Sequence, residues 1–579
     1  MKYQISLLIG ALAVTGTLGA NPKIANDLLN AAPNPSVKII VQFNLPPAQK
    51  QLNLLSGLGG LLGLNLDLSL INALTYTISS DAIVTLANSP DVKYISPDRA
   101  LRGSLEFANP TVNANLAFNA GYTGSGGLLA SLLGTSTVAI IDSGVTNHPD
   151  LNGVLLSRVV YSQSFVAGDS GTADAYGHGT HVAGIVAGNA SQSSGNSIHT
   201  FRGIAPGVGI VNLRVLDANG SGSDSSVIAA INRAVALKSQ YNIRVINLSL
   251  GRPVYESYLL DPLCQAVERA WKAGIVVVVA AGNDGRNNTA GTHGYGTISS
   301  PGNDPYVITV GAMKDMLTSN RGDDQIASYS SKGPSLLDHV VKPDLLAPGN
   351  RIVSLAVGGV IQKRGGAADQ VLLSYYQRSG ANTPSSNYYK LSGTSMAAPM
   401  VSGAAALLLG KSSSLTPDQV KIILMKSATK AFPAVSNVTD LVTNVTYTSH
   451  YDVFTVGAGY LDVWAALNYT SVPPTGAATS PIAVLNSING SVSLVRDSSA
   501  VWGDSAVWGD SGSFSMSAVW GSSIFVSGAS AVWGDSAVWG DSAVWGDSAV
   551  WGDSAVWGDS AVWGSNAVSA EAMMIAGEV

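Results

Sequence analysis

The chain has 579 residues, which is too long for one hydrophobic core and enough for several structural units. Only 12% of the residues are charged, and the net charge of −6 at pH 7 disfavours partners such as nucleic acid or an anionic membrane surface. Cys264 is the only cysteine, which excludes an intrachain disulfide framework.

The first 20 residues are typical of a secretory signal peptide. Met1-Lys2 is followed by an apolar run over 5–14 and then by small residues up to Ala20. This run is too short to cross a bilayer as a helix, so we expect no stable membrane span. The sequence therefore predicts a secreted, extracellular protein that is cleaved near Ala20.

Residues 37–100 predict a small α+β unit. Strands are expected at 37–43, 74–79 and 92–95, where β-branched residues or alternation dominate, and a helix is expected at 80–88. Residues 101–129 show little periodicity and are interpreted as a linker that runs into the next domain.

From residue 136 the pattern becomes strand, loop and helix in repetition. Continuous apolar strands separated by amphipathic helices predict an α/β fold, a mostly parallel sheet with helices on both faces. Sites in such sheets lie beyond the carboxyl ends of the strands. The predicted strands are TVAIID, GIVNLRVL, RVINLSL, GIVVVVAAG and YVITVGA.

Four residues with suitable chemistry fall at such positions. Asp142 ends a strand, His178 lies between glycines in YGHGTH, and Asn283 follows VVVVAAG. Ser395 in GTSMAAP falls where a helix begins. Each has a plain structural explanation by itself, because turns favour Asp and Asn and helix N-caps favour Ser. His181, one helical turn after His178, is interpreted as a buried or supporting histidine rather than a second base.

Taken together, the motifs DSGV, HGTHVAG, NLSLG, AAGNDG and GTSMAAP closely resemble those of the subtilisin-like serine proteases, the subtilase family (peptidase S8). The order of Asp142, His178 and Ser395 is also the order of the subtilisin triad. The resemblance covers roughly residues 130–470, and it implies that this part of the chain folds like subtilisin.

The resemblance implies a role for each residue. Ser395 would be the nucleophile, His178 the general base and then acid, and Asp142 its orienting partner. Asn283 would donate its amide to the oxyanion together with the backbone N–H of Ser395. Polypeptide substrates would bind as an added strand between two edges, formed by Gly220, Ser221 and Gly222 and by Ser249, Leu250 and Gly251.

The chemistry implied by the family requires no cofactor, although structural calcium is common there. Asp150 in NHPDL matches a calcium ligand of the family, but the loop 189–202, which would carry other ligands, does not match cleanly. Residues 37–100 resemble the ferredoxin-like propeptide of secreted subtilases, which acts as an intramolecular inhibitor, with a maturation cut expected between 98 and 107. An insertion at about 356–388, just before Ser395, could form a lid or rim.

Residues 499–564 repeat the hexapeptide Ser-Ala-Val-Trp-Gly-Asp. An even period and a regular turn signal suit a β-solenoid, while the composition suits a disordered low-complexity segment, so both interpretations stay open.

The expected organisation is a signal peptide 1–20, a spacer 21–36, a propeptide-like domain 37–100, a linker 101–129, a catalytic domain 130–470, a linker 471–498, the repeats 499–564 and a tail 565–579.

These features predict a secreted serine endopeptidase that is made as a self-processed zymogen. The alternative is a surface or assembly protein whose Trp-rich repeat is the main function and whose protease domain serves maturation. A lipase-type hydrolase is excluded, because the chain has no G-x-S-x-G elbow.

Overall fold

The computed structural model describes residues 36–59, 61–62, 73–97, 104–124, 136–153, 156–195, 197–289, 291–440, 443–471, 473, 475–485, 491–495, 513–515 and 578, together with 23, 24 and 28. The chain divides into two compact units, Met1–Leu101 and Arg102–Val579. The signal-like segment, the expected maturation segment up to 103 and the copies of the hexapeptide lie outside the described residues. Both interpretations of the repeat therefore stay predictions.

The first unit contains a four-stranded antiparallel sheet in the order β2-β3-β1-β4. Alternate residues of one strand face the same side, and Ile39, Val41 and Phe43 are accordingly buried. The strands and the helix predicted between 37 and 95 are present. The elements are β1 (Val37–Phe43), α2 (Gln49–Gly57), β2 (Leu61–Leu62), β3 (Ala73–Ile78), α3 (Ser80–Ala87) and β4 (Val92–Pro97).

The second unit is built on a sheet in the order β11-β10-β9-β8-β5-β7-β6, with β12 paired to β10. All these pairs are parallel except β10 with β11, which confirms the predicted α/β class. The strands are β5 (Thr137–Asp142), β6 (Val159–Ser164), β7 (Gly209–Arg214), β8 (Ile243–Leu248), β9 (Val276–Ala280), β10 (Ile308–Lys314), β11 (Gln325–Ile326) and β12 (Leu345–Pro348).

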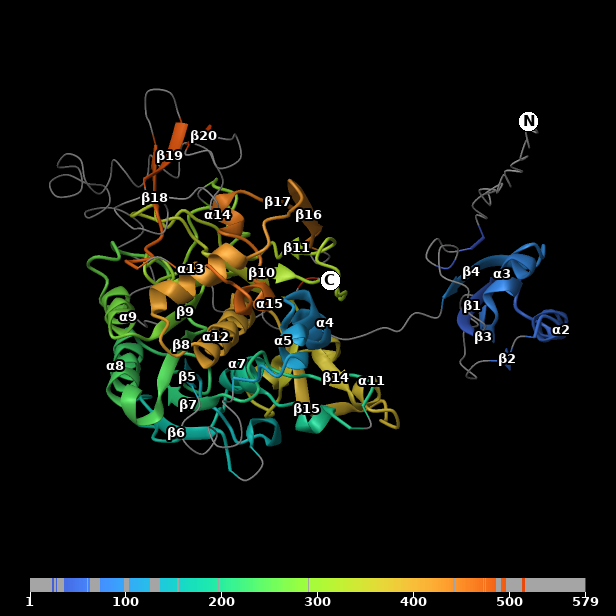
Figure 1. The fold of residues 1–579 in the computed structure, drawn as a ribbon, viewed down its shortest axis with the longest axis horizontal. Coiled ribbons are helices and arrows are strands. Elements are labelled where there is room, and N and C mark those ends of the chain that lie inside the picture. Colours follow the sequence, from blue (N-terminus) through green and yellow to red (C-terminus); the bar gives the residue numbers. More distant parts are fainter. Residues whose placement is uncertain are drawn as a thin grey trace, which may run out of the picture. The chain divides into compact units, whose positions relative to one another are not determined.

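The helices pack on this sheet as two pairs. Figure 1 shows the strands between the pair α8 (Asp224–Tyr241) and α9 (Pro262–Lys272) and the pair α7 (His178–Ala187) and α12 (Thr394–Lys411). Strands β5, β7 and β9 are buried along their whole length, as a sheet covered on both faces requires. Further helices are α13 (Pro417–Ser427), α14 (Val453–Val456) and α15 (Val463–Leu467).

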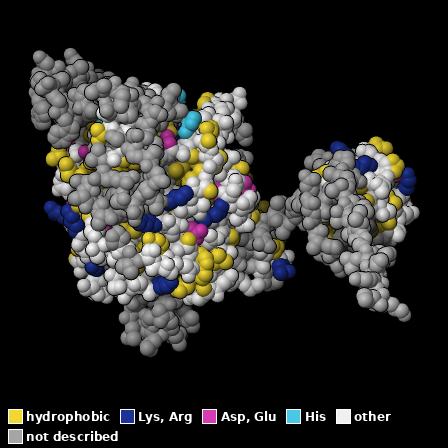
Figure 2. Space-filling model, turned by 45° about the horizontal axis from the view of Figure 1, so that its top comes forward, with side chains coloured by type: hydrophobic (Ala, Val, Ile, Leu, Met, Phe, Trp, Pro, Cys, Tyr) yellow, Lys and Arg dark blue, Asp and Glu magenta, His cyan; other side chains and the backbone are white. Residues whose placement is uncertain are grey.

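Charged side chains are sparse on the surface of the described part (Figure 2), as expected for a chain with 12% charged residues. On the face shown in Figure 2, Lys and Arg side chains lie scattered among polar and apolar ones. Among the described helices, none combines the length and the apolar character that crossing a bilayer requires.

The linker predicted at 101–129 is wrong for its described residues. This segment forms α4 (Ser104–Thr111) and α5 (Ala114–Asn119), and Ala108, Val112 and Ala117 join the core of the second unit. Pro110 lies inside α4 and Asn113 separates the two helices, so neither helix is long enough to show a clear 3.6-residue period.

The linker predicted at 471–498 is also wrong for its described residues. The segment carries β18 (Ile482–Leu485) and β19 (Ser491–Val495), whose Ala483 and Val492 lie in the core, and β19 pairs with β20 (Ser513–Ser515). Ser480 donates to Asp344 (2.5 Å), a buried carboxylate that also pairs with Lys342 (2.7 Å). A buried ion pair needs such additional partners, and the Ser480 hydroxyl therefore attaches this segment to the rest of the second unit.

The insertion before Ser395 forms a small sheet in the order β13-β15-β14. The backbone N–H groups of Val360 and Ile361 donate to the carbonyls of Ala175 (3.0 Å) and Tyr176 (2.9 Å), so the insertion packs on the segment that precedes His178. The elements here are β13 (Ile352–Leu355), α10 (Val360–Arg364), β14 (Gln370–Leu372), α11 (Leu373–Tyr376) and β15 (Pro384–Leu391). A separate hairpin of β16 (Val435–Thr439) and β17 (Thr446–His450) follows α13 in the chain.

Candidate active site

Asp142 and His178 form a fully buried pair at the carboxyl end of the parallel sheet. Asp142 is the last residue of β5 and His178 is the first residue of α7. Nδ1 of His178 lies 2.7 Å from Oδ1 of Asp142, and both side chains are inaccessible to solvent. An ionised carboxylate on Nδ1 holds the proton there, which leaves Nε2 as the acceptor nitrogen of a neutral ring.

Glycines on both sides of His178 make this approach possible. Gly177 has a φ of +99°, which favours glycine. A Cβ at Gly179 would lie 2.3 Å from the carbonyl oxygen of Gly144 and 3.1 Å from Asp142. The close contact of α7 with the end of β5 therefore depends on these two glycines.

Asp174 is a second buried carboxylate beside this pair, and motif reasoning missed it. It accepts the N–H groups of Gly177 (2.6 Å) and Thr180 (2.8 Å) and the hydroxyl of Ser143 (2.8 Å). Ser143 also approaches Asp142, whose Oδ1 accepts the Ser143 N–H at 2.7 Å. Asp174 thus fixes both the start of α7 and the residue after Asp142. Asp174 lies in the polar loop before α7, where no local sequence pattern marks it.

The two histidines of α7 differ in their ability to take up a proton. Burial lowers the pKa of His178, but the charge and hydrogen bond of Asp142 and the charge of Asp174 outweigh burial and raise it above the ordinary value. Burial and the neighbouring charge of His178 lower the pKa of His181 to about 3. His178 is therefore the stronger base of the two, while His181 stays neutral.

Ser395 is the second residue of α12, where backbone N–H groups have no partner within the helix. Its Oγ donates to the carbonyl of Ser249 (3.1 Å). Pro399, four residues on, has no N–H for the Ser395 carbonyl. The hydroxyl of Ser249 supplies that hydrogen bond instead (2.8 Å). The segment after β8 thus holds the backbone of Ser395.

A short chain of polar side chains supports Ser249. Asn247 donates its Nδ2 to the Ser249 hydroxyl (2.9 Å), and Ser402, two turns along α12, donates to Oδ1 of Asn247 (2.7 Å). All three side chains are buried. They fix the end of β8 against α12. Asn247 is the first residue of the motif NLSLG, whereas no motif includes Ser402.

Asn283 is oriented by the residue that precedes Ser395. Its Oδ1 accepts the backbone N–H (2.9 Å) and the hydroxyl (3.1 Å) of Thr394. This pairing assigns the other end of the amide as Nδ2, the donor. A Cβ built on Gly393 would lie 3.3 Å from Nδ2, so the donor faces the start of α12.

The two expected substrate edges contact different residues around this centre. Ser249 bonds with Ser395 as described, and Leu250 beside it is buried. Gly220 has a φ of +79°, and a Cβ there would lie 2.7 Å from the ring of Tyr176, which precedes the His178 loop. Ser221 closes a turn, because its carbonyl accepts the N–H of Asp217 (2.8 Å). Both edges are closely packed, since a Cβ on Gly222 or on Gly251 would lie within 3.0 Å of a neighbouring residue.

The calcium ligand expected at Asp150 does not fit the contacts of this residue. Its Oδ1 accepts the hydroxyl of Ser191 and the N–H of Gln192 (both 2.8 Å), and its Oδ2 accepts the hydroxyl of Tyr388 (2.6 Å). The two carboxylate oxygens of Asp150 thus accept three hydrogen bonds. A calcium ion at this position would instead need further oxygen ligands, and these neighbours are donors. Within the described ranges, no group of three or more His, Cys, Asp and Glu side chains could hold a metal.

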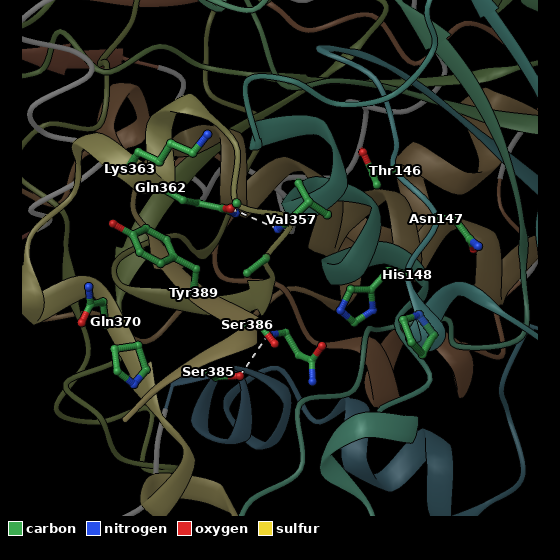
Figure 3. A pocket seen from close by; sticks show the side chains of 15 residues that line it. Thr146, Asn147, His148, Val357, Gln362, Lys363, Gln370, Ser385, Ser386 and Tyr389 are labelled. Carbon is green, nitrogen blue, oxygen red and sulfur yellow. Dashed lines mark hydrogen bonds between the residues drawn. The ribbon is translucent and has the colours of Figure 1, made fainter. Parts of the chain in front are cut away.

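A pocket of about 520 Å³ lies where the insertion meets the loop after β5. Figure 3 shows Thr146, Asn147 and His148 of that loop on one side and Gln362 and Tyr389 of the insertion on the other. Oε1 of Gln362 accepts the N–H of Val357 (3.0 Å), which fixes this wall. The insertion therefore forms a polar rim next to the segment that carries His178.

Comparison with known proteins identifies the class. The sequence profile of the subtilase family, Peptidase_S8, matches residues 134–448. The chain belongs to this family and is a subtilisin-like serine endopeptidase.

Its relatives include two proteases of Bacillus subtilis (strain 168). "Serine protease AprX" is 35% identical over 371 residues, which are 62% of this chain and 75% of the relative. "Subtilisin E" is 33% identical over 364 residues, which are 62% of this chain and 76% of the relative. A solved cold adapted subtilisin-like serine proteinase aligns over 53% of this chain and 84% of its own, with 30% identity and a TM-score of 0.36.

Proposed function

We propose that the protein is a secreted serine endopeptidase that cleaves extended polypeptides through Asp142, His178 and Ser395. The observation that carries this proposal is the buried 2.7 Å contact between His178 Nδ1 and Asp142 Oδ1, together with a helix that has Ser395 in its first turn. An Asp-oriented imidazole and a serine at a helix N-terminus are the parts that acyl transfer needs.

In this mechanism the Ser395 hydroxyl turns from the Ser249 carbonyl toward His178 and attacks the scissile carbonyl. The proton moves from Oγ to Nε2 of His178, and Asp142 stabilises the imidazolium that forms. The imidazolium then donates its proton to the leaving amine, which departs as the acyl-enzyme forms. Water, deprotonated by His178, attacks the acyl-enzyme. His178 then returns this proton to Oγ as the bond to Ser395 breaks and the carboxylic acid product leaves.

The oxyanion of each tetrahedral intermediate would be bound by Asn283 Nδ2 and the backbone N–H of Ser395. Thr394 fixes the Asn283 amide before substrate arrives, so little reorganisation is needed during reaction. The substrate would lie as an extended strand between residues 220–222 and 249–251, pairing through its backbone. No step requires a metal or another cofactor.

We further propose that residues 1–20 direct secretion and that residues 37–100 act as an inhibitory propeptide, removed by a cut between 98 and 107. The support is a separate compact unit that ends at Leu101, next to the expected cut. A covalently attached unit of this kind inhibits at high effective concentration and is lost by dilution after cleavage.

Ser395→Ala tests the proposal. The variant should lose casein cleavage by about 10⁶-fold in kcat, the scale measured for the same change in subtilisin, and it should keep residues 37–100 attached. Ser414→Ala changes an exposed serine beyond the same helix and is the matched control. Casein hydrolysis and intact mass are measured for both. Cleavage and maturation at wild-type rates in Ser395→Ala would contradict the proposal.

A further inference from the structure

Glu578 lies in a buried niche of the second unit. Its side chain is almost fully buried, and its carboxylate pairs with Nη2 of Arg286 at 2.9 Å. The same carboxylate accepts the N–H of Ser328 (2.8 Å) and the Ser328 hydroxyl. The carboxylate thus meets three donors, one of which is charged.

The niche also recognises the backbone of Glu578. Nδ2 of Asn350 donates to the Glu578 carbonyl (2.9 Å), and the Glu578 N–H donates to Oδ1 of Asn350 (2.8 Å). One side-chain amide therefore satisfies both peptide groups at this residue. Such a reciprocal pair requires the backbone of Glu578 to lie in one orientation.

The walls of the niche come from segments far apart in the sequence. Arg286 follows β9, Ser328 follows β11, and Asn350 lies between β12 and β13. The turn after β16 adds Asp440, which pairs with Nη1 of Arg286 (2.8 Å) and holds the guanidinium in place. These segments belong to the core of the catalytic unit, so the niche is a fixed feature of that unit.

The contacts select glutamate. A buried carboxylate is stable only when it is paired and hydrogen-bonded, and here it is both. Glutamine could still accept these donors through its single oxygen, because all three meet Oε1, but it would remove the negative charge that pairs with Arg286. Without Glu578, the buried N–H of Ser328 would lack an acceptor and Arg286 would keep only one of its two carboxylates.

We propose that this niche is a docking site for the chain's own segment at Glu578, which fastens the chain beyond the hexapeptide repeat to the catalytic unit. The chain before the repeat is already fixed there, because the Ala483 N–H donates to the His339 carbonyl (2.9 Å) and Val492 lies in the core. The chain is therefore attached to one unit both before residue 499 and at Glu578.

A fluorophore on Val579→Cys tests the docking, because the native Cys264 is buried and will not label. Ser395→Ala is used as the background so that the full chain is retained. We expect time-resolved anisotropy with a slow component that reports the tumbling of the whole protein. Glu578→Gln and, separately, Arg286→Gln should abolish that component and leave the fast segmental motion of an untethered chain.

Glu571→Gln is the matched control, since it removes one negative charge from the same segment, and it should keep the slow component. Equal anisotropy in Glu578→Gln and Glu571→Gln, with both variants folded by circular dichroism, would overturn the proposal. A slow component that appears only when unlabelled protein is added would also overturn it, because the niche would then hold Glu578 of a second copy.

Discussion

At the scale of single residues, the sequence identifies the side chains that would react but not the residues that hold them in place. Asp142, His178, Asn283 and Ser395 stand out because each lies where a strand ends or a helix begins. Asp174 does not stand out in the sequence, because a carboxylate in a polar loop gives no sign that it folds back onto the end of β5. Its contacts with Ser143, Gly177 and Thr180 exist only once β5 and α7 are packed together.

Asp174→Asn should move the acid limb of the pH profile of kcat/KM to lower pH. His178 must be neutral to act as a base, so activity rises as pH rises through its pKa. Asp174 is one of the charges that raise this pKa, and removing it lowers the pKa. We also expect kcat to fall by about 10- to 100-fold, because an amide nitrogen would face N–H donors and displace α7.

The control for this prediction is Asp169→Asn, which neutralises an exposed carboxylate in the same loop. It should leave the acid limb in place. A limb that stays at the same pH in Asp174→Asn, or moves to higher pH, would show that Asp174 does not act on His178 through its charge.

At the scale of elements, long and strongly periodic segments could be predicted and short ones could not. The strands β5 and β7 to β10 and the helices α7, α8, α9 and α12 occur where the apolar pattern placed them. The sequence pattern predicts linkers where the helices α4 and α5 and the strands β18 and β19 lie. The two helices are too short to display a clear period, and all four elements are stabilised by packing in the core of the second unit.

The junction of β8 with α12 gives a prediction at this scale. Ser249→Ala should lower the free energy of unfolding by about 1–3 kcal/mol and reduce kcat, because the Ser395 carbonyl, which has no N–H at Pro399, loses the Ser249 hydroxyl as a donor. Adding Pro399→Ala should recover part of both losses, since the N–H of Ala at 399 can bond the carbonyl four residues before it.

Urea unfolding and casein hydrolysis of the two single variants and the double variant would measure this coupling. Purely additive effects of Ser249→Ala and Pro399→Ala would mean that the Ser249 hydroxyl does not substitute for the missing helical N–H.

At the scale of the whole molecule, the insertion and the segment after 470 are part of the catalytic unit. Tyr388 of β15 bonds Asp150, and Ser480 bonds Asp344. Neither hydrogen bond could be predicted from the sequence, because its partners lie 238 positions apart in the first pair and 136 in the second, and such contacts leave no local pattern. The Asp150 carboxylate, which the family resemblance suggested as a calcium ligand, accepts the Tyr388 hydroxyl and two further donors.

Tyr388→Phe should lower the free energy of unfolding by about 1.5–3 kcal/mol, because it removes a hydrogen bond to a buried charge. Tyr389→Phe is the matched control, since the Tyr389 hydroxyl has no hydrogen-bond partner among the described residues. Chelation with EDTA should lower the unfolding temperature of wild type no more than that of Asp150→Asn. A loss on chelation that Asp150→Asn abolishes would show that Asp150 binds a cation.

The central claim is that Ser395 is the nucleophile activated by His178, and labelling with a fluorophosphonate tests it most directly. Attack by Oγ forms a phosphorus–oxygen bond and expels fluoride. Mass spectrometry after trypsin digestion should find one adduct in residues 391–411, located by fragmentation on Ser395, and labelling should slow strongly in His178→Ala. An adduct on another residue, or unchanged labelling in Ser395→Ala, would contradict the account.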